Sequence, residues 1–270
     1  MLDITGASKT FLQGTVNEHV ALNRLDLHLD AGEFVTIVGS NGAGKSTLFN
    51  AIGGTFYLDS GRISLESRDI TYLTEHKRAA FIGRIFQDPV KGTAPDMTIE
   101  ENLSLAYNRR KLFGLNMGVQ KKDVVFFREQ LSQFGMGLED RMKHKVGLLS
   151  GGQRQALTLL MATIAGPRLL LLDEHTAALD PAAAEKVMAI TRDIVSREKL
   201  TTMMITHNIR SALRTGTRTI MLEDGKVILD ISGKEREEMT VSRLMELYSH
   251  KANKTLDNDR MLLTKDENGQ

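Results

Sequence analysis

The stretch GSNGAGKST at residues 39–47 combines glycines with a lysine and two hydroxyl side chains, which together suit a bound phosphate group. Its spacing fits G-x-x-x-x-G-K-[S/T], and it follows an apolar run at residues 32–40 and opens a predicted helix. Gly42 and Gly44 let successive backbone N–H groups turn inward, so that these groups and the helix dipole face the phosphates. We therefore predict a nucleotide site here and not an ordinary glycine-rich turn.

The side chains of this stretch have expected roles toward a nucleoside triphosphate. Lys45 supplies a positive charge for the β- and γ-phosphates, Ser46 is placed to bind Mg²⁺, and Thr47 can hydrogen-bond near the α-phosphate. The predicted ATP-binding residues of this stretch are Ser40, Asn41, Gly42, Ala43, Gly44, Lys45, Ser46 and Thr47.

An acidic pair follows the apolar run at residues 168–173, which we predict to be a buried strand. Asp173 is expected to hold Mg²⁺ and its water. Glu174, one residue beyond, is placed to polarise the attacking water as general base, a role worth about 10²–10⁴-fold in rate. Such a pair can also simply begin a loop, but its occurrence beside a phosphate site favours the catalytic role.

A second glycine pair lies in LLSGGQRQ, residues 148–155. Ser150 and Gln153 have the spacing of a capping box, which predicts a helix that starts here. Gly151 and Gly152 in its first turn cost about 0.5–1 kcal/mol each relative to alanine unless a close neighbour requires them. Because residues 39–47 already enclose one set of phosphates, the second helix end points to an ATP held by another subunit.

The segments GSNGAGKST, LSGGQRQ, LLLLDE, AALD and MMITHN, in this order, resemble the ATPase subunit of an ATP-binding-cassette (ABC) transporter over nearly the whole chain. In that family two such subunits enclose two ATP molecules. The resemblance therefore implies ATP and Mg²⁺ as ligands and a second copy of the chain as partner. It also implies contact with the partner's ATP by Ser150, Gly151, Gly152, Gln153 and Asp180.

The same resemblance assigns roles to isolated residues. It places Phe11 on the adenine ring with Val20 nearby, Gln87 on Mg²⁺ and the attacking water, and His207 on the γ-phosphate. Taken alone, Phe11 could be a core residue and His207 a structural histidine.

Two positions depart from the family's pattern. Phe11 stands where tyrosine is commoner. His175 stands where proline is common, and this change is expected to relax the loop after Glu174.

The pattern of elements indicates an α/β fold. The resemblance implies a P-loop NTPase core with a mostly parallel sheet, an antiparallel β subdomain and an α-helical signature subdomain. We predict one nucleotide-binding domain over residues 1–250, with the helical subdomain at 88–165, and a polar tail at 251–270 to which we assign no function. Residues 107–125 are basic at both ends and suit either a solvated insertion or a docking surface for a membrane subunit.

The expected elements are strands at 24–30, 32–40, 61–67, 168–173 and 201–207, helices from 44 to 53, 121 to 134 and 181 to 198, and a hairpin with its turn at 224–225. Thr98 and Glu101 form a second capping box, and Asp180 caps the helix that begins at Pro181.

Composition narrows the partners. With 35 basic and 34 acidic residues the formal charge is +1, so we expect no nucleic-acid partner. No stretch approaches the roughly 20 apolar residues that span a bilayer. The chain has no cysteine, which excludes disulfides and does not decide the compartment. Its first residues lack the features of a secretory signal, so we expect it in the cytoplasm.

These features favour energy coupling for an importer at the cytoplasmic face of the cell membrane. Two copies would grip separately encoded permease subunits, and an extracytoplasmic binding protein would deliver the solute. The overall pattern also resembles an amino-acid import group with members linked to tryptophan uptake. An exporter subunit has the same catalytic residues and stays an alternative. A soluble clamp on nucleic acid or ribosomes is disfavoured by the near-neutral charge, the single cassette and the lack of a long coiled-coil insertion.

Overall fold

The computed structural model describes residues 1–108 and 119–252, and the chain divides into two compact units. The first unit combines residues 1–75 with the chain from residue 201 onward, and the second comprises residues 76–200. The predicted polar tail lies outside the described residues beyond 252, as does most of the basic segment 107–125. The predicted helical subdomain, 88–165, falls within the second unit.

The first unit contains a small antiparallel sheet with the strand order β2-β1-β4-β5. Its strands are β1 (Leu2–Phe11), β2 (His19–Leu29), β4 (Ser60–Leu65) and β5 (Arg68–Asp69). In β2, Leu25, Leu27 and Leu29 are buried while the residues between them are exposed, as the alternation of a half-buried strand requires. The predicted strands at 24–30 and 61–67 are thus confirmed, whereas β1 was not predicted.

A second set of strands in this unit has the order β10-β9-β3-β8. The strands are β3 (Phe34–Gly39), β8 (Thr201–Ile205), β9 (Arg218–Glu223) and β10 (Lys226–Ser232). Strand β3 pairs in parallel with both β8 and β9, and all six of its residues are buried, which explains its continuous apolar sequence. Asp224 and Gly225 have φ of 46° and 72°, as a two-residue hairpin turn requires, so the predicted hairpin is confirmed.

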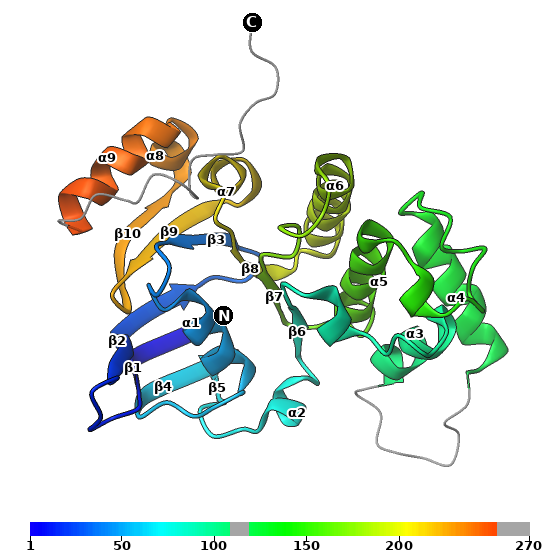
Figure 1. Cartoon of the computed structure of the whole chain (residues 1–270), viewed down its shortest axis with the longest axis horizontal. Coiled ribbons are helices and arrows are strands. Elements are labelled where there is room, and N and C mark those ends of the chain that lie inside the picture. Colours follow the sequence, from blue (N-terminus) through cyan, green and yellow to red (C-terminus); the bar gives the residue numbers. More distant parts are fainter. Residues whose placement is uncertain (109–118, 253–270) are drawn as a thin grey trace, which may run out of the picture. The chain divides into compact units, whose positions relative to one another are not determined.

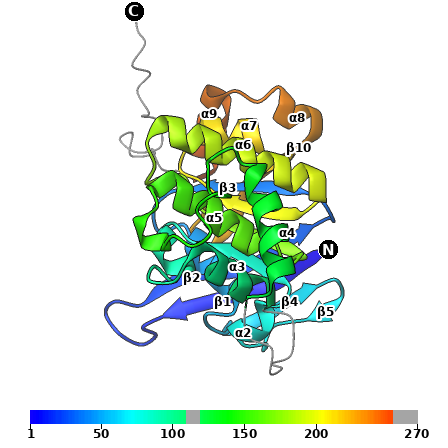
Figure 2. The ribbon, with the colours of Figure 1, turned by 90° about the vertical axis from the view of Figure 1, so that its right-hand side faces the viewer.

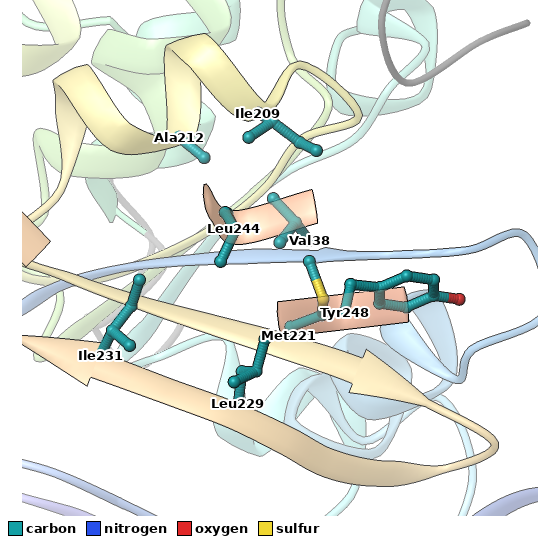
Figure 3. Close-up of a cluster of buried hydrophobic side chains, with 8 residues drawn as sticks. All are labelled: Val38, Ile209, Ala212, Met221, Leu229, Ile231, Leu244 and Tyr248. Atoms are coloured by element: carbon teal, nitrogen blue, oxygen red, sulfur yellow. The ribbon is translucent and has the colours of Figure 1, made fainter. Parts of the chain in front are cut away.

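Helices cover one side of these strands, and the small antiparallel sheet lies on the other (Figures 1 and 2). The covering helices are α7 (Ile209–Thr215), α8 (Gly233–Glu237) and α9 (Val241–Ala252). Between them and the strands lies an apolar cluster, drawn in Figure 3, of Val38, Ile209, Ala212, Met221, Leu229, Ile231, Leu244 and Tyr248. Helix α1 (Lys45–Gly53) follows β3 and ends at Gly54, whose φ of 86° suits only glycine well.

The second unit joins a parallel strand pair to a group of helices. Strand β6 (Ile82–Ile85) pairs with β7 (Leu169–Asp173). Four helices lie together in this unit, as Figure 2 shows: α3 (Ile99–Asn108), α4 (Lys121–Ser132), α5 (Gly151–Thr163) and α6 (Pro181–Glu198). Shorter turns are α2 (Glu75–Arg78), η1 (Pro89–Gly92) and η2 (Val146–Leu148).

The helix starts follow the predicted capping signals. The Thr98 backbone N–H donates to Glu101 Oε2 at 2.7 Å, and the Glu101 N–H donates back to Thr98 Oγ1 at 3.4 Å. Asp180 Oδ1 accepts from the Ala183 N–H at 2.9 Å, and α6 has the predicted bounds. The α/β fold class is confirmed. In the described part of the chain, no helix is both long enough and apolar enough to cross a membrane.

We expect Leu244→Ala to lower the free energy of unfolding by about 2–5 kcal/mol, because Leu244 is fully buried in the apolar cluster under α9. Urea denaturation followed by circular dichroism measures this loss. Leu105→Ala on α3 is the matched control, since Leu105 is 59% exposed and its truncation leaves no cavity. Equal losses in the two variants would show that α9 contributes little to the core.

Candidate functional site

Residues 39–47, here called the phosphate loop, run from the end of β3 into the first turn of α1. Gly39 has φ of 155°, and a Cβ added to it would lie 2.3 Å from the carbonyl oxygen of Leu222. Gly44 has φ of 98°, and its Cβ would lie 2.4 Å from the carbonyl oxygen of Ala21. Both positions therefore exclude any other residue, because neighbouring main chain fills the space of a side chain.

Gly42 differs from these two glycines, since no atom lies within 4 Å of the position of an added Cβ. Its φ of 84° requires glycine, while the space beside it is not filled by protein. A turn that opens onto free space in front of a helix N-terminus suits an anionic group that the backbone must approach closely. The open space beside Gly42 is compatible with a bound phosphate.

Lys45 lies folded into this loop. Its side chain is buried, and Nζ donates to the carbonyl oxygens of Gly39 and Ser40, both at 2.8 Å. These bonds hold the ammonium group on the inner side of the loop. Ser46 is exposed and Thr47 is half-buried.

Phe11 and Val20 come together at the loop end of the β1–β2 hairpin, where Thr10 pairs with Val20 and Phe11 with His19. Phe56 holds the Phe11 ring edge-on, with centroids 5.4 Å apart and an interplanar angle of 88°. Phe11 is still 36% exposed. Because Ala21, next to Val20, touches Gly44, this hairpin end lies beside the phosphate loop.

His207 follows β8 at the same edge of the sheet as the phosphate loop. Ile37 of β3 pairs with Ile205 of β8, and the Thr206 N–H donates to the Ile37 carbonyl at 3.1 Å. Gly39 and His207 each come two residues after this Ile37–Ile205 pair, so they lie at the same end of the two neighbouring parallel strands. Such carboxyl ends of parallel strands are where ligands bind in open α/β sheets.

The second unit brings Gln87, Asp173 and Glu174 to one strand edge. Ile85 of β6 pairs with Leu172 of β7, so Gln87 and Glu174 occupy equivalent positions beyond their strands. Glu174 has φ of 46°, which is uncommon for a residue with a side chain and marks a backbone held by its surroundings. This backbone strain lies at the residue predicted to be the general base.

The donors predicted for Mg²⁺ fit this ion chemically. Among residues 1–108 and 119–252 no group of three His, Cys, Asp or Glu side chains could hold a metal ion. Mg²⁺ does not need such a group, since it is usually bound by one or two carboxylates together with substrate phosphates and water. Ser46, Gln87 and Asp173 offer one carboxylate and two neutral oxygens, which matches this pattern.

His175 anchors the loop after Glu174 to helix α6, contrary to the expected relaxation of this loop. It is buried, and its Nε2 lies 3.1 Å from Thr191 Oγ1. The Thr191 hydroxyl donates its proton to the Val187 carbonyl at 2.8 Å, so His175 Nε2 must be the donor to Thr191. Burial lowers the pKa of His175 from 6.5 to about 4, which keeps the ring neutral at physiological pH.

The start of α5 has the predicted capping box, with both Ser150–Gln153 bonds at 3.3 Å. Gln153 Nε2 also donates to the Met136 carbonyl at 3.2 Å. A Cβ on Gly152 would lie 3.0 Å from the Cβ of Ala183, so close packing on α6 favours glycine there. A Cβ on Gly151, which is exposed, would meet only the end of a flexible side chain, Leu179 Cδ2, at 3.2 Å, so packing explains glycine less well at this position.

Sequence reasoning missed Glu223 and Tyr248. Glu223 Oε2 accepts hydrogen bonds from Ser40 Oγ at 2.6 Å and from the Tyr248 hydroxyl at 2.8 Å. No local spacing signals these contacts, because the three residues come from β9, the phosphate loop and α9.

Residues 22–177 match the protein family described as ABC transporter. The chain belongs to the ABC transporter family. Its sequence is 44% identical to the tyrosine transport ATP-binding protein of Clostridioides difficile over 250 residues, which are 93% of this chain and 99% of the relative. It is 34% identical to the lipoprotein-releasing system ATP-binding protein LolD of a Ruegeria species, over 84% of this chain and 97% of the relative.

Solved ABC cassettes have the same fold. The dimeric post-hydrolysis state of the cassette MJ0796, bound to ADP and Pi, matches with a TM-score of 0.72 and 28% identity, over 86% of this chain and 98% of that one. A nucleotide-free cassette from an ABC transporter matches with a TM-score of 0.74 and 25% identity, over 92% and 98%. This ABC protein is accordingly the ATP-binding and ATP-hydrolysing subunit of a transporter.

The buried His175 predicts a pH dependence of stability. Its pKa is lower in the folded chain than in the unfolded one, so the unfolded chain binds the extra proton and stability is lost as the pH falls from 6.5 toward 4. Between pH 7 and pH 5 we expect the wild type to lose about 2 kcal/mol more than His175→Gln, which keeps a donor but does not titrate. Urea unfolding at both pH values measures this difference, and parallel losses would contradict the assigned burial.

Proposed function

We propose that this ABC ATPase powers the import of an amino-acid-like solute, with the aromatic amino acids as first candidates. The observation that supports this most is the 44% identity to the tyrosine transport ATP-binding protein along nearly the full length of both chains. In this proposal two copies bind permease subunits at the cytoplasmic face of the cell membrane. An extracytoplasmic binding protein delivers the solute.

We propose that the first unit holds the nucleotide. The phosphate loop would surround the phosphates with backbone N–H groups, Lys45 would neutralise the charge that develops on the β- and γ-phosphates, and Phe11 would stack on adenine beside Val20. The fit of the loop supports these roles, because Gly42 faces open space and Lys45 Nζ lies within the loop. His207 would contact the γ-phosphate.

The roles proposed for the second unit concern water and metal. Glu174 would orient and polarise the attacking water, and Gln87 would contact the same water. Ser46, Gln87 and Asp173 would hold Mg²⁺, which when bound offsets phosphate charge. The shared strand edge of Gln87, Asp173 and Glu174 supports this assignment.

The remaining residues are proposed to act on the ATP of a second copy. Ser150, Gly151, Gly152 and Gln153 begin α5, and Asp180 caps α6, so their backbone groups lie at helix starts. A dimeric ATP-binding cassette among the similar solved structures supports the pairing of two copies. ATP would favour the closed pair and hydrolysis would release it, and this cycle would drive the permease.

A second candidate function is release or export rather than import. It is favoured by the 34% identity to the lipoprotein-releasing ATP-binding protein LolD over most of both chains. Nucleotide-site residues do not separate the two functions, because in both cases the solute crosses the permease.

The test of the proposal is purification of tagged Glu174→Gln protein with ATP from gently solubilised native membranes, followed by mass spectrometry and uptake assays. A permease with a binding protein, together with loss of labelled tyrosine or tryptophan uptake on deletion of the gene, would support amino-acid import. A permease without a binding protein and unchanged uptake would support export. Recovery only in the soluble fraction with nucleic acid or ribosomes would refute a transport role.

We expect Glu174→Gln to bind ATP and accumulate closed dimers while its turnover falls by about 10²–10⁴-fold, because the general base is lost. Phosphate release and gel filtration with ATP measure the two effects. Glu185→Gln on the exposed face of α6 is the control with the same change of charge, and it should hydrolyse normally. Lys45→Ala should lose nucleotide binding. A normal rate in Glu174→Gln would show that another residue is the base.

Phe11→Ala should weaken ATP binding by about 1–3 kcal/mol, the usual range for loss of an aromatic ring stacked on a base. Binding of inorganic triphosphate should stay unchanged, because it has no base. Phe11→Tyr keeps a ring and should bind ATP like the wild type. Calorimetric titration of each variant with both ligands measures these affinities. If Phe11→Ala binds ATP and triphosphate more weakly by the same factor, then Phe11 supports the fold and does not contact adenine.

A further inference from the structure

A buried carboxylate lies directly behind the phosphate loop. Glu223 is the last residue of β9 and is only 6% exposed. Its Oε2 atom accepts one hydrogen bond from Ser40 Oγ of the phosphate loop and another from the hydroxyl of Tyr248 on α9, at 2.6 and 2.8 Å. The carboxylate thus connects the loop that surrounds the phosphates to the last helix of the described chain.

The surroundings of Tyr248 keep its hydroxyl directed at the Glu223 carboxylate. Its ring is 1% exposed and lies in the apolar cluster under α9, while its hydroxyl oxygen points away from the other cluster side chains (Figure 3). Burial, together with the hydrogen bond to Glu223, raises the pKa of Tyr248 to about 12. The phenol therefore keeps its proton and stays a donor over the physiological pH range.

Ser40 connects the Glu223 carboxylate to Lys45 through its side chain and its backbone. While the Ser40 side chain donates to Glu223, its carbonyl oxygen accepts from Lys45 Nζ at 2.8 Å. The bonds on the two sides of Ser40 thus fix the backbone of this residue and the direction of the lysine.

The β9–β10 hairpin supports the same loop at two further points. The Leu222 carbonyl lies against Gly39, and the Gly225 N–H donates to the Ala43 carbonyl at 3.2 Å. The phosphate loop is thus contacted at Gly39, Ser40 and Ala43 by three residues of the β9–β10 hairpin, Leu222, Glu223 and Gly225. The contact through Glu223 extends to α9 by the hydrogen bond from Tyr248.

We propose that Glu223 and Tyr248 are positioning residues for ATP binding, which hold Ser40 so that the phosphate loop keeps the shape that receives the phosphates. Helix α9 thereby becomes part of the nucleotide-binding machinery and not only a cover of the sheet. The inference rests on the proposed role of residues 39–47 in holding ATP. It adds two residues to that role, one of them from the C-terminal helix.

The first variant is Tyr248→Phe in the full chain, which removes the hydroxyl and keeps the ring in its apolar cluster. Ser249→Ala is the matched control on the same helix, because the Ser249 hydroxyl donates to the Met245 carbonyl within α9 and, among the described residues, has no hydrogen bond to the phosphate loop. We expect the KM for ATP to rise about tenfold in Tyr248→Phe, as loss of one hydrogen bond to a charged group implies, with kcat within about twofold of the wild type. Ser249→Ala should leave both constants unchanged.

A double-mutant cycle shows whether the effect passes through Ser40. Ser40→Ala should itself raise the KM for ATP, and Tyr248→Phe should add little to it, because both changes break the same chain of bonds. Independent, multiplicative effects would overturn the proposal, as would a KM in Tyr248→Phe equal to that of Ser249→Ala. If Lys45→Ala and Ser40→Ala both bind ATP normally, the assigned phosphate loop itself is wrong, which is a different failure.

Thermal melting without nucleotide separates positioning from stability. Glu223→Gln provides a second variant that keeps the size of the side chain, should Tyr248→Phe fold poorly. We expect Glu223→Gln to raise the KM for ATP as well. A lower melting temperature with an unchanged KM in the folded protein would reduce Glu223 and Tyr248 to a purely structural role and refute the proposal.

Discussion

The nucleotide site depends on one steric constraint: the chain must turn from β3 into α1 with its backbone pressed against neighbouring main chain. A side chain at Gly39 would overlap the Leu222 carbonyl, and one at Gly44 would overlap the Ala21 carbonyl. The two contacts place β9 and β2 on either side of the loop. The space beside Gly42 stays open, and the backbone there is accessible to the phosphates that the proposed function assigns to this loop.

Two charged side chains at this loop, Lys45 and Glu223, each make two hydrogen bonds. Burying a polar group without such partners would cost free energy. Lys45 Nζ uses two loop carbonyls, and the Glu223 carboxylate uses two hydroxyls. In the second unit, the buried ring of His175, just after β7, also has a hydrogen-bond partner: it stays neutral and donates to Thr191. Precise placement of the chemical groups thus comes from hydrogen bonds that would be costly to break, which suits a site that must be ready before ATP binds.

The features described above concern ATP and not the transported solute. Within each unit, the residues proposed for hydrolysis lie at the carboxyl ends of parallel strands, which is where ligands bind in open α/β sheets. Relatives named for tyrosine transport and for lipoprotein release share this cassette at 44% and 34% identity. The same cassette thus occurs in proteins named for different transported molecules, so the cassette by itself does not identify the solute.

The amino-acid sequence alone determined the features that depend on neighbours in the chain: the phosphate loop, the capping boxes of α3 and α5, the start of α6 and the hairpin turn at Asp224 and Gly225. Their signals are local, since a cap or a turn is formed by residues a few positions apart. Only the tertiary structure decided that Gly152 packs on Ala183, that His175 is buried against Thr191, and that Glu223 joins Ser40 to Tyr248. These contacts join residues far apart in the chain, and no periodicity or spacing encodes which of many buried partners the fold brings together.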